Sequence, residues 1–215
     1  LLWHESRKKD STILLEYIAG NDLLEILISQ RGRTGATLDL LATSLVSLWD
    51  ETRRKRGVKS DYVTQLINRT DDIESVHSQL FNLEPDLEQL LQQARRLERL
   101  LRSPFSMLIH GDFNVDNIVY SPERDQIFFV DVHRSGYGDY VQDVSVFLVS
   151  NFRVPIFSPD IRQRLNEVNA RIFAVACAYA EANGDATFHA RLALGVFRSL
   201  VTSTRFLFDE ACVKD

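Results

Sequence analysis

The hydrophobic pattern of this 215-residue chain changes once from a helical period to short strands and then back, and this change constrains the fold most. Between residues 106 and 131, short apolar runs are separated by polar loops, which is typical of strands. Ser121-Pro122-Glu123-Arg124-Asp125 has the composition of a turn and predicts a hairpin. The sequence therefore predicts a predominantly helical α+β fold with a short β-hairpin near its centre.

Helices are expected wherever apolar residues repeat at intervals of three and four. The expected helices cover residues 23–27, 38–48, 87–101, 141–148, 161–175 and 192–201, with one or two short helices between 60 and 82. Ser158-Pro159-Asp160 gives the helix that follows it a cap, a proline at the first position and an early acid. Near the N-terminus, the β-branched and aromatic residues 12–18 predict a strand that ends in a turn at Ala19-Gly20.

Composition argues against several classes of partner. The net charge is −5 and the one dense basic run, Arg53–Arg56, is interpreted as the end of a helix, so no nucleic-acid surface is expected. No apolar run reaches the roughly 18–20 residues that a membrane span needs, so no membrane partner is expected. Cys177 and Cys212 lack His or Cys neighbours at metal-ligand spacing and are interpreted as buried thiols. We expect a soluble, cytoplasmic protein.

Polar residues concentrate where the predicted strands end, and such loops often carry chemistry. They are His110, Asp112, Asn114, Asp116, Asn117, Asp131, His133, Asp139 and Asp143. Asp131 ends the second strand of the hairpin, so the folded hairpin can bring it beside Asn117. A carboxylate and an amide oxygen suit Mg²⁺, which takes further ligands from water and substrate phosphates. A second carboxylate that leaves the metal free can accept the proton of an incoming hydroxyl.

Three segments resemble parts of the aminoglycoside phosphotransferase and choline kinase superfamily. His110-Gly111-Asp112-Phe113-Asn114-Val115-Asp116-Asn117 resembles its H-G-D-x-x-x-x-N catalytic loop. Asp131-Val132-His133-Arg134-Ser135-Gly136-Tyr137-Gly138-Asp139, followed by Asp143, resembles its metal-binding segment, and Leu14-Leu15-Glu16-Tyr17-Ile18-Ala19-Gly20 resembles the hinge between its lobes. The resemblance implies a protein-kinase-like C-terminal lobe whose catalytic region is the short hairpin.

The same resemblance implies how the sequence is divided. Residues 1–20 would be the last strand or strands of an N-terminal lobe together with the hinge, and residues 21–215 would be the C-terminal lobe. The Gly-rich loop and strand lysine of the N-terminal lobe are expected upstream in the full-length protein. Apolar surface near residues 12–20 would then be exposed when these residues are taken alone.

The resemblance also implies the chemistry. Asp112 would be the catalytic base, while Asn117 and Asp131 would hold the Mg²⁺ ions that bridge the phosphates of ATP, or of GTP. The acceptor would be a small polar molecule with a hydroxyl, such as an amino sugar, a sugar, a choline-like alcohol or an antibiotic. The helices from 140 to 207 would form its pocket.

Five further residues receive supporting or nucleotide-binding roles from the resemblance. His110 would support the loop, and Asp139 and Asp143 would fix the loop and cap the helix after it. The backbone C=O of Glu16 and the backbone N–H of Ile18 would bond the adenine edge.

Alternatives remain open at this point. The protein could be a non-catalytic kinase-like module that binds nucleotide or a partner protein. Phosphorylation of proteins is less favoured, because residues 131–143 are too short for an activation segment. His133 and Arg134 could face a substrate or make a structural contact, and Asn114 and Asp116 could touch substrate or bond within the loop.

Overall fold

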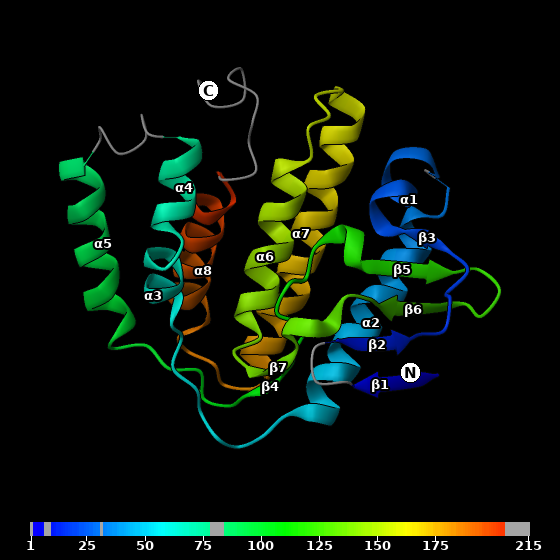
Figure 1. The fold of residues 1–215 in the computed structure, drawn as a ribbon, viewed down its shortest axis with the longest axis horizontal. Helices are drawn as coiled ribbons and strands as arrows, with labels where there is room; N and C mark the ends of the chain where they lie inside the picture. The colour runs from blue at the N-terminus through cyan, green and yellow to red at the C-terminus, as the bar shows by residue number, and fades with distance from the viewer. Residues whose placement is uncertain (1, 7–9, 31, 78–83, 205–215) are drawn as a thin grey trace.

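The computed structural model describes residues 2–6, 10–30, 32–77 and 84–204, and it confirms the predominantly helical α+β fold. In Figure 1 the long helices α6 (Val141–Arg153) and α7 (Pro159–Ala182) run through the middle of the molecule. On one side of them lies the hairpin of β5 (Ile118–Ser121) and β6 (Gln126–Phe129). On the other side lie α3 (Tyr62–Ile67), α4 (Thr70–Val76), α5 (Glu84–Glu98) and α8 (Phe188–Ser203). The hairpin and the loops that lead into it thus face the helices that were expected to form a pocket.

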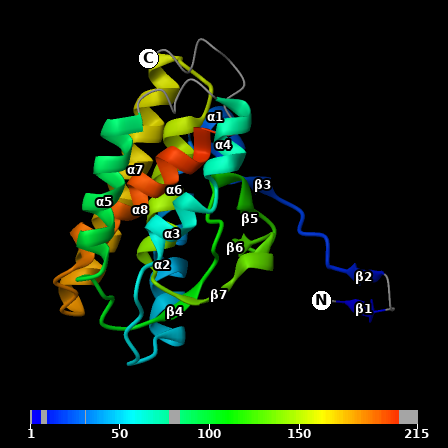
Figure 2. The same cartoon turned by 60° about the vertical axis from the view of Figure 1, so that its left-hand side comes forward.

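The N-terminal strands form a separate ribbon. β1 (Trp3–Ser6) pairs antiparallel with β2 (Ser11–Leu14), and Figure 2 shows this ribbon projecting from the helical body. The predicted strand over 12–18 is therefore too long, because within the described residues no strand pairs with residues 15–20. Leu15 and Tyr17 are 64% and 85% exposed, which confirms the expected apolar surface.

The first two helices bury the apolar faces that the sequence predicted. α1 (Leu23–Ser29) begins at Asp22, whose side chain accepts the N–H of Glu25 at 2.7 Å. α2 (Thr34–Thr52) buries its leucine stripe together with Trp49. The basic run comes after the last turn of α2, where Arg54 forms an isolated β-bridge with Ser106 and packs over the ring of Tyr137.

The segment from 60 to 98 is helical and stands beside α8. Two short helices, α3 (Tyr62–Ile67) and α4 (Thr70–Val76), confirm the expectation for residues 60–82 within the described part. α5 (Glu84–Glu98) begins before and ends before its predicted range. Tyr62, Val63, Ala94, Leu101 and Leu194 form a second, smaller core cluster there.

Short strands occupy the predicted central segment. β5 (Ile118–Ser121) and β6 (Gln126–Phe129) form the expected hairpin, and Asp125 in its turn has a φ of 47°. β4 (Met107–Ile109) pairs with β7 (Gly136–Gly138), and the two-residue β3 (Asn21–Asp22) pairs with β5. β3 and β7 were not predicted, because neither contains an apolar run.

Three long helices complete the fold. α6 (Val141–Arg153), α7 (Pro159–Ala182) and α8 (Phe188–Ser203) extend beyond their predicted ranges at one or both ends. Ser158 stands at the cap position of α7, but its side chain makes no capping hydrogen bond, so that detail of the prediction is wrong. Cys177 is half-buried, and residues 205–215, with Cys212, lie outside the described residues. Among the described helices, none has the length and apolarity to cross a bilayer.

Candidate active site

The loop of residues 110–117 begins where β4 ends, and a side chain of α6 holds its first residues. The carboxylate of Asp143 on α6 accepts the backbone N–H of His110 at 2.7 Å and that of Gly111 at 2.9 Å. Gly111 has a φ of +85°, and a Cβ there would come within 2.5 Å of the C=O of Arg134. Only glycine fits this conformation and this close approach. These contacts are the ones that the predicted loop-fixing role of Asp143 requires.

His110 connects this loop to the hairpin. Its Nδ1 accepts the N–H of Asp112 at 3.3 Å, and its Nε2 lies 2.8 Å from the C=O of Val130. A neutral histidine that accepts at Nδ1 carries its hydrogen on Nε2, so Nε2 donates to Val130. The ring is buried and lies beside Phe113 and Phe129. This placement suits the predicted supporting role.

We expect Asp143 to give the protein a measurable pH dependence of stability. Burial raises the pKa of its carboxyl to about 6, although the N–H groups of His110 and Gly111 and the charge of Arg198 act in the opposite direction. The native state then binds a proton below pH 6 that the unfolded protein binds only near about 3.9. The contribution of this carboxyl to the free energy of unfolding therefore rises as the pH falls from about 6 to about 4, by up to about 1.4 kcal/mol per pH unit.

Urea unfolding of the wild type and of Asp143→Asn across this pH range measures that contribution. It is the difference between the two proteins in the slope of unfolding free energy against pH. The variant cannot titrate at this position, so its curve should lack the rise. Parallel curves for the two proteins would contradict a buried, protonatable carboxyl at Asp143.

The side chain of Asp112 is held from two sides. Its Oδ1 accepts an N–H of the Asn114 amide at 2.8 Å, and its Oδ2 forms an ion pair with Arg134 at 3.0 Å. The side chain remains 25% exposed. Asn114 therefore bonds within the loop, and Arg134 makes an ion pair with Asp112. Each carboxylate oxygen keeps a second lone pair for another hydrogen bond.

Asn117 and Asp131 are brought together by the register of the hairpin. The N–H of Val130 donates to the C=O of Asn117 at 3.0 Å, which extends the β5–β6 pairing by one position. The Nδ2 of Asn117 donates to the C=O of Asp112 at 2.9 Å. Asp131 has a φ of 57° and a ψ of 47°, and this left-handed conformation ends the strand. The geometric expectation that Asp131 lies beside Asn117 is confirmed.

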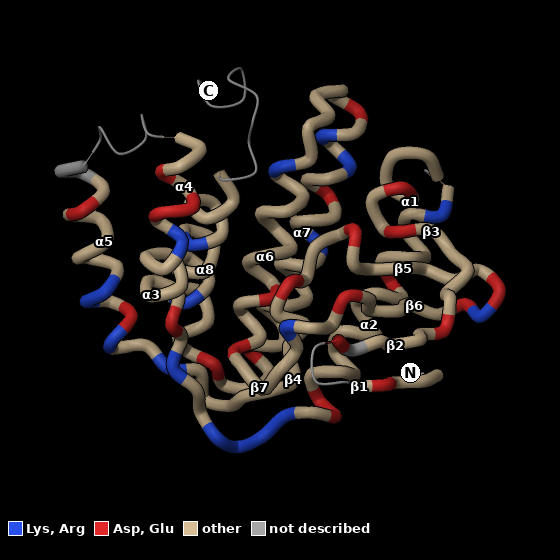
Figure 3. The backbone as a smooth tube through the Cα atoms, in the orientation of Figure 1, with Lys and Arg blue, Asp and Glu red and all other residues tan. Residues whose placement is uncertain are grey.

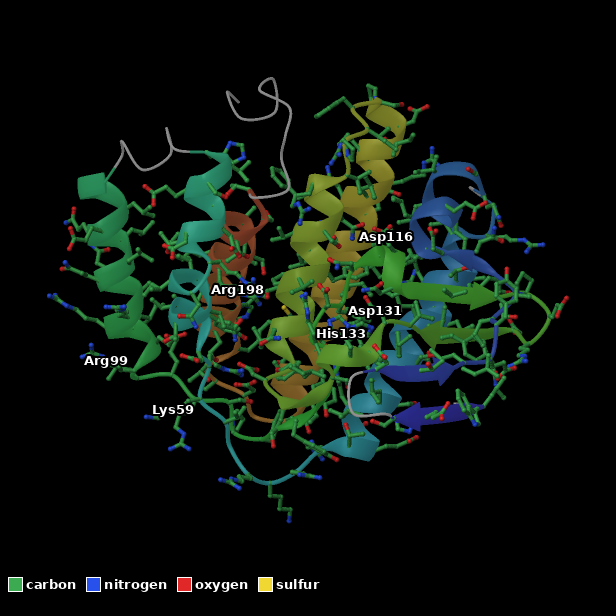
Figure 4. The ribbon with its side chains drawn as sticks, viewed as in Figure 1. Lys59, Arg99, Asp116, Asp131, His133 and Arg198 are labelled. Carbon is green, nitrogen blue, oxygen red and sulfur yellow. The ribbon has the colours of Figure 1, made fainter. Side chains whose placement is uncertain are left out.

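A series of polar contacts connects Asp131 to Asp112. His133 Nδ1 lies 2.8 Å from Asp131 Oδ1, and Arg134 Nε donates to His133 Nε2 at 3.1 Å before its NH1 reaches Asp112. In Figure 4, Asp131 and His133 lie side by side in the middle of the molecule. Because Nε2 accepts, the ring hydrogen of His133 is on Nδ1 and points at Asp131. The cation of Arg134 thus offsets the repulsion between two nearby carboxylates.

The donors available for a metal ion are few. Among the described residues no group of three or more His, Cys, Asp or Glu is arranged to hold one. The amide of Asn117 uses its nitrogen on Asp112 and has its oxygen left to coordinate, and the side chain of Asp131 is 57% exposed. One amide oxygen and one carboxylate fit Mg²⁺, which keeps water and phosphate oxygens as its other ligands.

Asp139 belongs to a buried network at the end of β7. Its Oδ2 accepts from Ser60 at 2.9 Å and from Tyr62 at 3.3 Å, and its Oδ1 pairs with Arg191. Oδ1 also accepts the N–H of Val141, the first residue of α6, at 3.2 Å. The contact with Val141 is of the kind that the predicted helix-capping role needs.

The hinge candidates lie along the edge of the hairpin. The side chain of Glu16 pairs with Arg124 in the hairpin turn, and Gly20 packs so closely on the C=O of Tyr120 that a side chain there would clash. Within the described residues, no backbone hydrogen bond uses the C=O of Glu16 or the N–H of Ile18. The nucleotide-binding role of the two groups stays a prediction.

A cavity of about 350 Å³ opens next to Asp112. Its walls come from the loop of residues 110–117, from α6 and from α8, so helices beyond residue 140 do line a pocket, as the sequence predicted. Charged side chains that sequence analysis did not assign contribute to it, notably Arg153 and Arg198. Their only sequence signal is a cation at the end or on the polar side of an apolar helix, which also fits a solvated surface.

A kinase-like lobe with Asp112, Asn117 and Asp131 around a hairpin is the arrangement expected of a phosphotransferase. The model of the "Phosphotransferase enzyme family" matches residues 4–179, and the chain belongs to this family. Comparison with curated proteins finds no significant sequence match.

Solved structures share the fold at low identity. A glucosamine kinase is 14% identical with a TM-score of 0.57, over 98% of this chain and 60% of that protein. A second structure of a glucosamine kinase, in complex with glucosamine, ADP and inorganic phosphate, is 14% identical with a TM-score of 0.55, over 91% of this chain and 58% of that protein. An aminoglycoside-3'-phosphotransferase of type VIII is 19% identical with a TM-score of 0.51, over 89% of this chain and 67% of that protein. The chain therefore spans about 60% of the length of the glucosamine kinases that it matches.

Proposed function

We propose that the protein transfers the γ-phosphoryl group of ATP to a hydroxyl of a small polar acceptor. The acceptor classes are an amino sugar, a sugar, a choline-like alcohol or an antibiotic, and GTP is the alternative donor. The observation that carries the proposal is the hairpin register: the N–H of Val130, the residue before Asp131, donates to the C=O of Asn117, and the amide of Asn117 bonds the backbone of Asp112. Membership of the phosphotransferase family supports it.

In the proposed reaction Asp112 orients the acceptor hydroxyl and takes its proton. The hydroxyl oxygen forms a bond to the γ-phosphorus, the bond from that phosphorus to the β–γ bridging oxygen breaks, and ADP leaves with the bonding electrons. Asn114 and Arg134 hold the carboxylate of Asp112 in one orientation, so little motion is needed before transfer.

Mg²⁺, held by Asn117 and Asp131, would supply charge neutralisation at the phosphates. His133 orients the carboxylate of Asp131, and the C=O of Val130 fixes the ring of His110 between the loop and the hairpin. These residues keep the metal-binding pair and the base at a constant separation.

The nucleotide base is assigned to the hinge. We propose that the C=O of Glu16 and the N–H of Ile18 bond the adenine edge, and that residues 1–20 continue an N-terminal lobe that carries a Gly-rich loop and a lysine. The exposed side chains of Leu15 and Tyr17 support this proposal, because they offer apolar surface against which such a lobe would pack. The proposal places the protein in the cytoplasm, where ATP and Mg²⁺ are available.

A non-catalytic module that binds nucleotide or a partner protein is the second candidate. The ion pair between Arg134 and Asp112 favours it, because this pair gives the carboxylate a partner without any substrate. A binding module would need such a stable arrangement, whereas an enzyme needs Asp112 to remain able to take a proton.

The proposal is tested by ATP consumption of the full-length protein with the four acceptor classes, with Mg²⁺ or with a chelator. We expect acceptor-stimulated turnover that the chelator abolishes. Asp131→Asn should lower kcat at least about 100-fold, because it removes the charged ligand. The matched variant Asp72→Asn, in an exposed ion pair with Arg69, should behave as wild type. Tight binding of Mg·ATP with no turnover in any acceptor would instead support the module.

A further inference from the structure

The cavity beside Asp112 continues into a second one. The second cavity, of about 360 Å³, shares Gly111, Arg134, Arg198 and Thr202 with the first and adds the arginine that precedes α4, Arg69. In Figure 4, Arg198 on α8 and Asp116 before β5 lie on either side of α6, which supplies the wall between them. A ligand whose hydroxyl reaches Asp112 therefore lies along α6 and within the space that Arg198 faces.

Cations outnumber acids in this space. Among the described lining residues, the first cavity has Arg134, Arg153 and Arg198 against Asp112 and Asp116. The second cavity has three arginines, and none of its described lining residues is an acid. One of the two acids, Asp112, already accepts an ion pair from Arg134. Arg153 is half-buried at the end of α6. Burial lowers the pKa of its guanidinium, and the negative charges of Asp112 and Asp116 act in the opposite direction. The balance of charge toward α8 is positive.

Arg198 is placed by packing. Its guanidinium carbon lies 5.4 Å from the centroid of the ring of Tyr62, which is fully buried and bonded to Asp139. The positive charge of Arg198 counteracts the effect of burial on the pKa of Asp143. Both carboxylate oxygens of Asp143 accept backbone N–H groups of the loop of residues 110–117. A planar guanidinium fixed in this way suits the bidentate binding of a carboxylate or phosphate.

The lining is unsuited to a cationic acceptor. A quaternary ammonium group is bound by aromatic faces, and none of the described lining residues of either cavity is aromatic. An acceptor with several amino groups needs several carboxylates, and toward α8 the described walls offer arginines and hydroxyls instead. The hydroxyls are those of Ser150, Ser199, Thr202 and Ser203, which suit the hydroxyl groups of a polyol.

We propose that the acceptor carries an anionic oxygen group, a carboxylate or a phosphate ester, and that Arg198 and Arg153 bind this group while Asp112 receives the hydroxyl. This inference rests on the proposed function and narrows its acceptor class. Arg198 is then a specificity-determining residue.

Four hexoses that differ mainly in charge test the proposal: glucose, glucosamine, glucuronate and glucose 6-phosphate. Binding of each to the full-length protein is measured by calorimetry, together with Arg198→Gln and the control Arg171→Gln, whose arginine pairs with Asp39 on a different surface. We expect glucuronate or glucose 6-phosphate to bind at least about tenfold more tightly than glucose and glucosamine, and Arg198→Gln alone to remove this difference. The tighter of the two anions identifies the carboxylate or the phosphate ester as the preferred group.

Equal affinities, tightest binding of glucosamine, or a preference for anions that survives in Arg198→Gln would each overturn the proposal. ATP consumption with the same four compounds distinguishes a failure of the anionic-acceptor proposal from a failure of the proposed kinase function. Turnover with glucose or glucosamine and none with the anions would uphold a kinase and overturn the anionic acceptor. Anion binding that depends on Arg198, without turnover of any compound, would uphold the anion site and contradict the kinase.

Discussion

We expect Asp112→Asn to lower kcat by about 10³-fold, with the affinity for Mg·ATP changed by less than about threefold. An amide oxygen is too weakly basic to take the proton of the acceptor hydroxyl, so the step loses its base. The substitution keeps the shape of the side chain, and Asn114 can still donate to the remaining oxygen at this position. The change should appear in kcat rather than in nucleotide binding, because Asn117 and Asp131 are untouched.

The control for this experiment is Asp125→Asn in the turn of the hairpin. Asp125 has a φ of 47°, a conformation that asparagine also tolerates, and its carboxylate accepts a hydrogen bond from the hydroxyl of Tyr120 at the molecular surface. It should retain wild-type turnover. If Asp112→Asn turned over at a rate close to wild type, Asp112 would be an orienting residue at most and the proton would leave by another route.

The hairpin and the loop before it could be predicted because their signals are local. Apolar runs, the turn residues 121–125 and the period of the flanking helices each depend on neighbours in sequence. The register then follows from the turn, so the proximity of Asn117 and Asp131 was predictable from the sequence. The sequence also contains the loop glycine at 111, although only the structure shows which carbonyl its missing side chain makes room for.

Contacts between distant residues could not be predicted in the same way. Arg198 and Gly111 line the same cavities although they are far apart in the sequence, and Arg134 could have faced solvent as readily as Asp112. A cation on a helix is usually a solvated residue, and its sequence looks the same in both cases. Figure 3 shows how widely such charges are spread over the backbone, so the arginines of the pocket do not stand out by type alone.

The buried arginine of α8 illustrates the same limit. Leu192 and Leu194 indicate the apolar face of α8, whereas Arg191 beside them is fully buried and pairs with both Asp139 and Asp185. Burial alone would lower the pKa of Arg191, but the two carboxylates outweigh it and raise the pKa, so the guanidinium stays charged. Helical periodicity cannot predict a buried ion triad, because the three residues come from separate segments.

Replacing this arginine should have the largest effect on stability. Arg191→Met would leave two carboxylates buried close together without a cation, and breaking a buried ion pair on one side typically costs about 3–5 kcal/mol. We expect the free energy of unfolding in urea to fall by about this amount at neutral pH.

The matched control is Arg171→Met on α7. Its partner Asp39 and Arg171 itself are 66% and 41% exposed in their side chains, so the same substitution should cost less than about 1 kcal/mol. A loss of stability as small for Arg191→Met would mean that the triad contributes little beyond its packing. A loss of several kcal/mol would support a structural role for the triad. Asp139 also accepts the N–H of Val141 at the start of α6, the helix whose Asp143 holds the loop of residues 110–117, so the triad connects α8 to this loop.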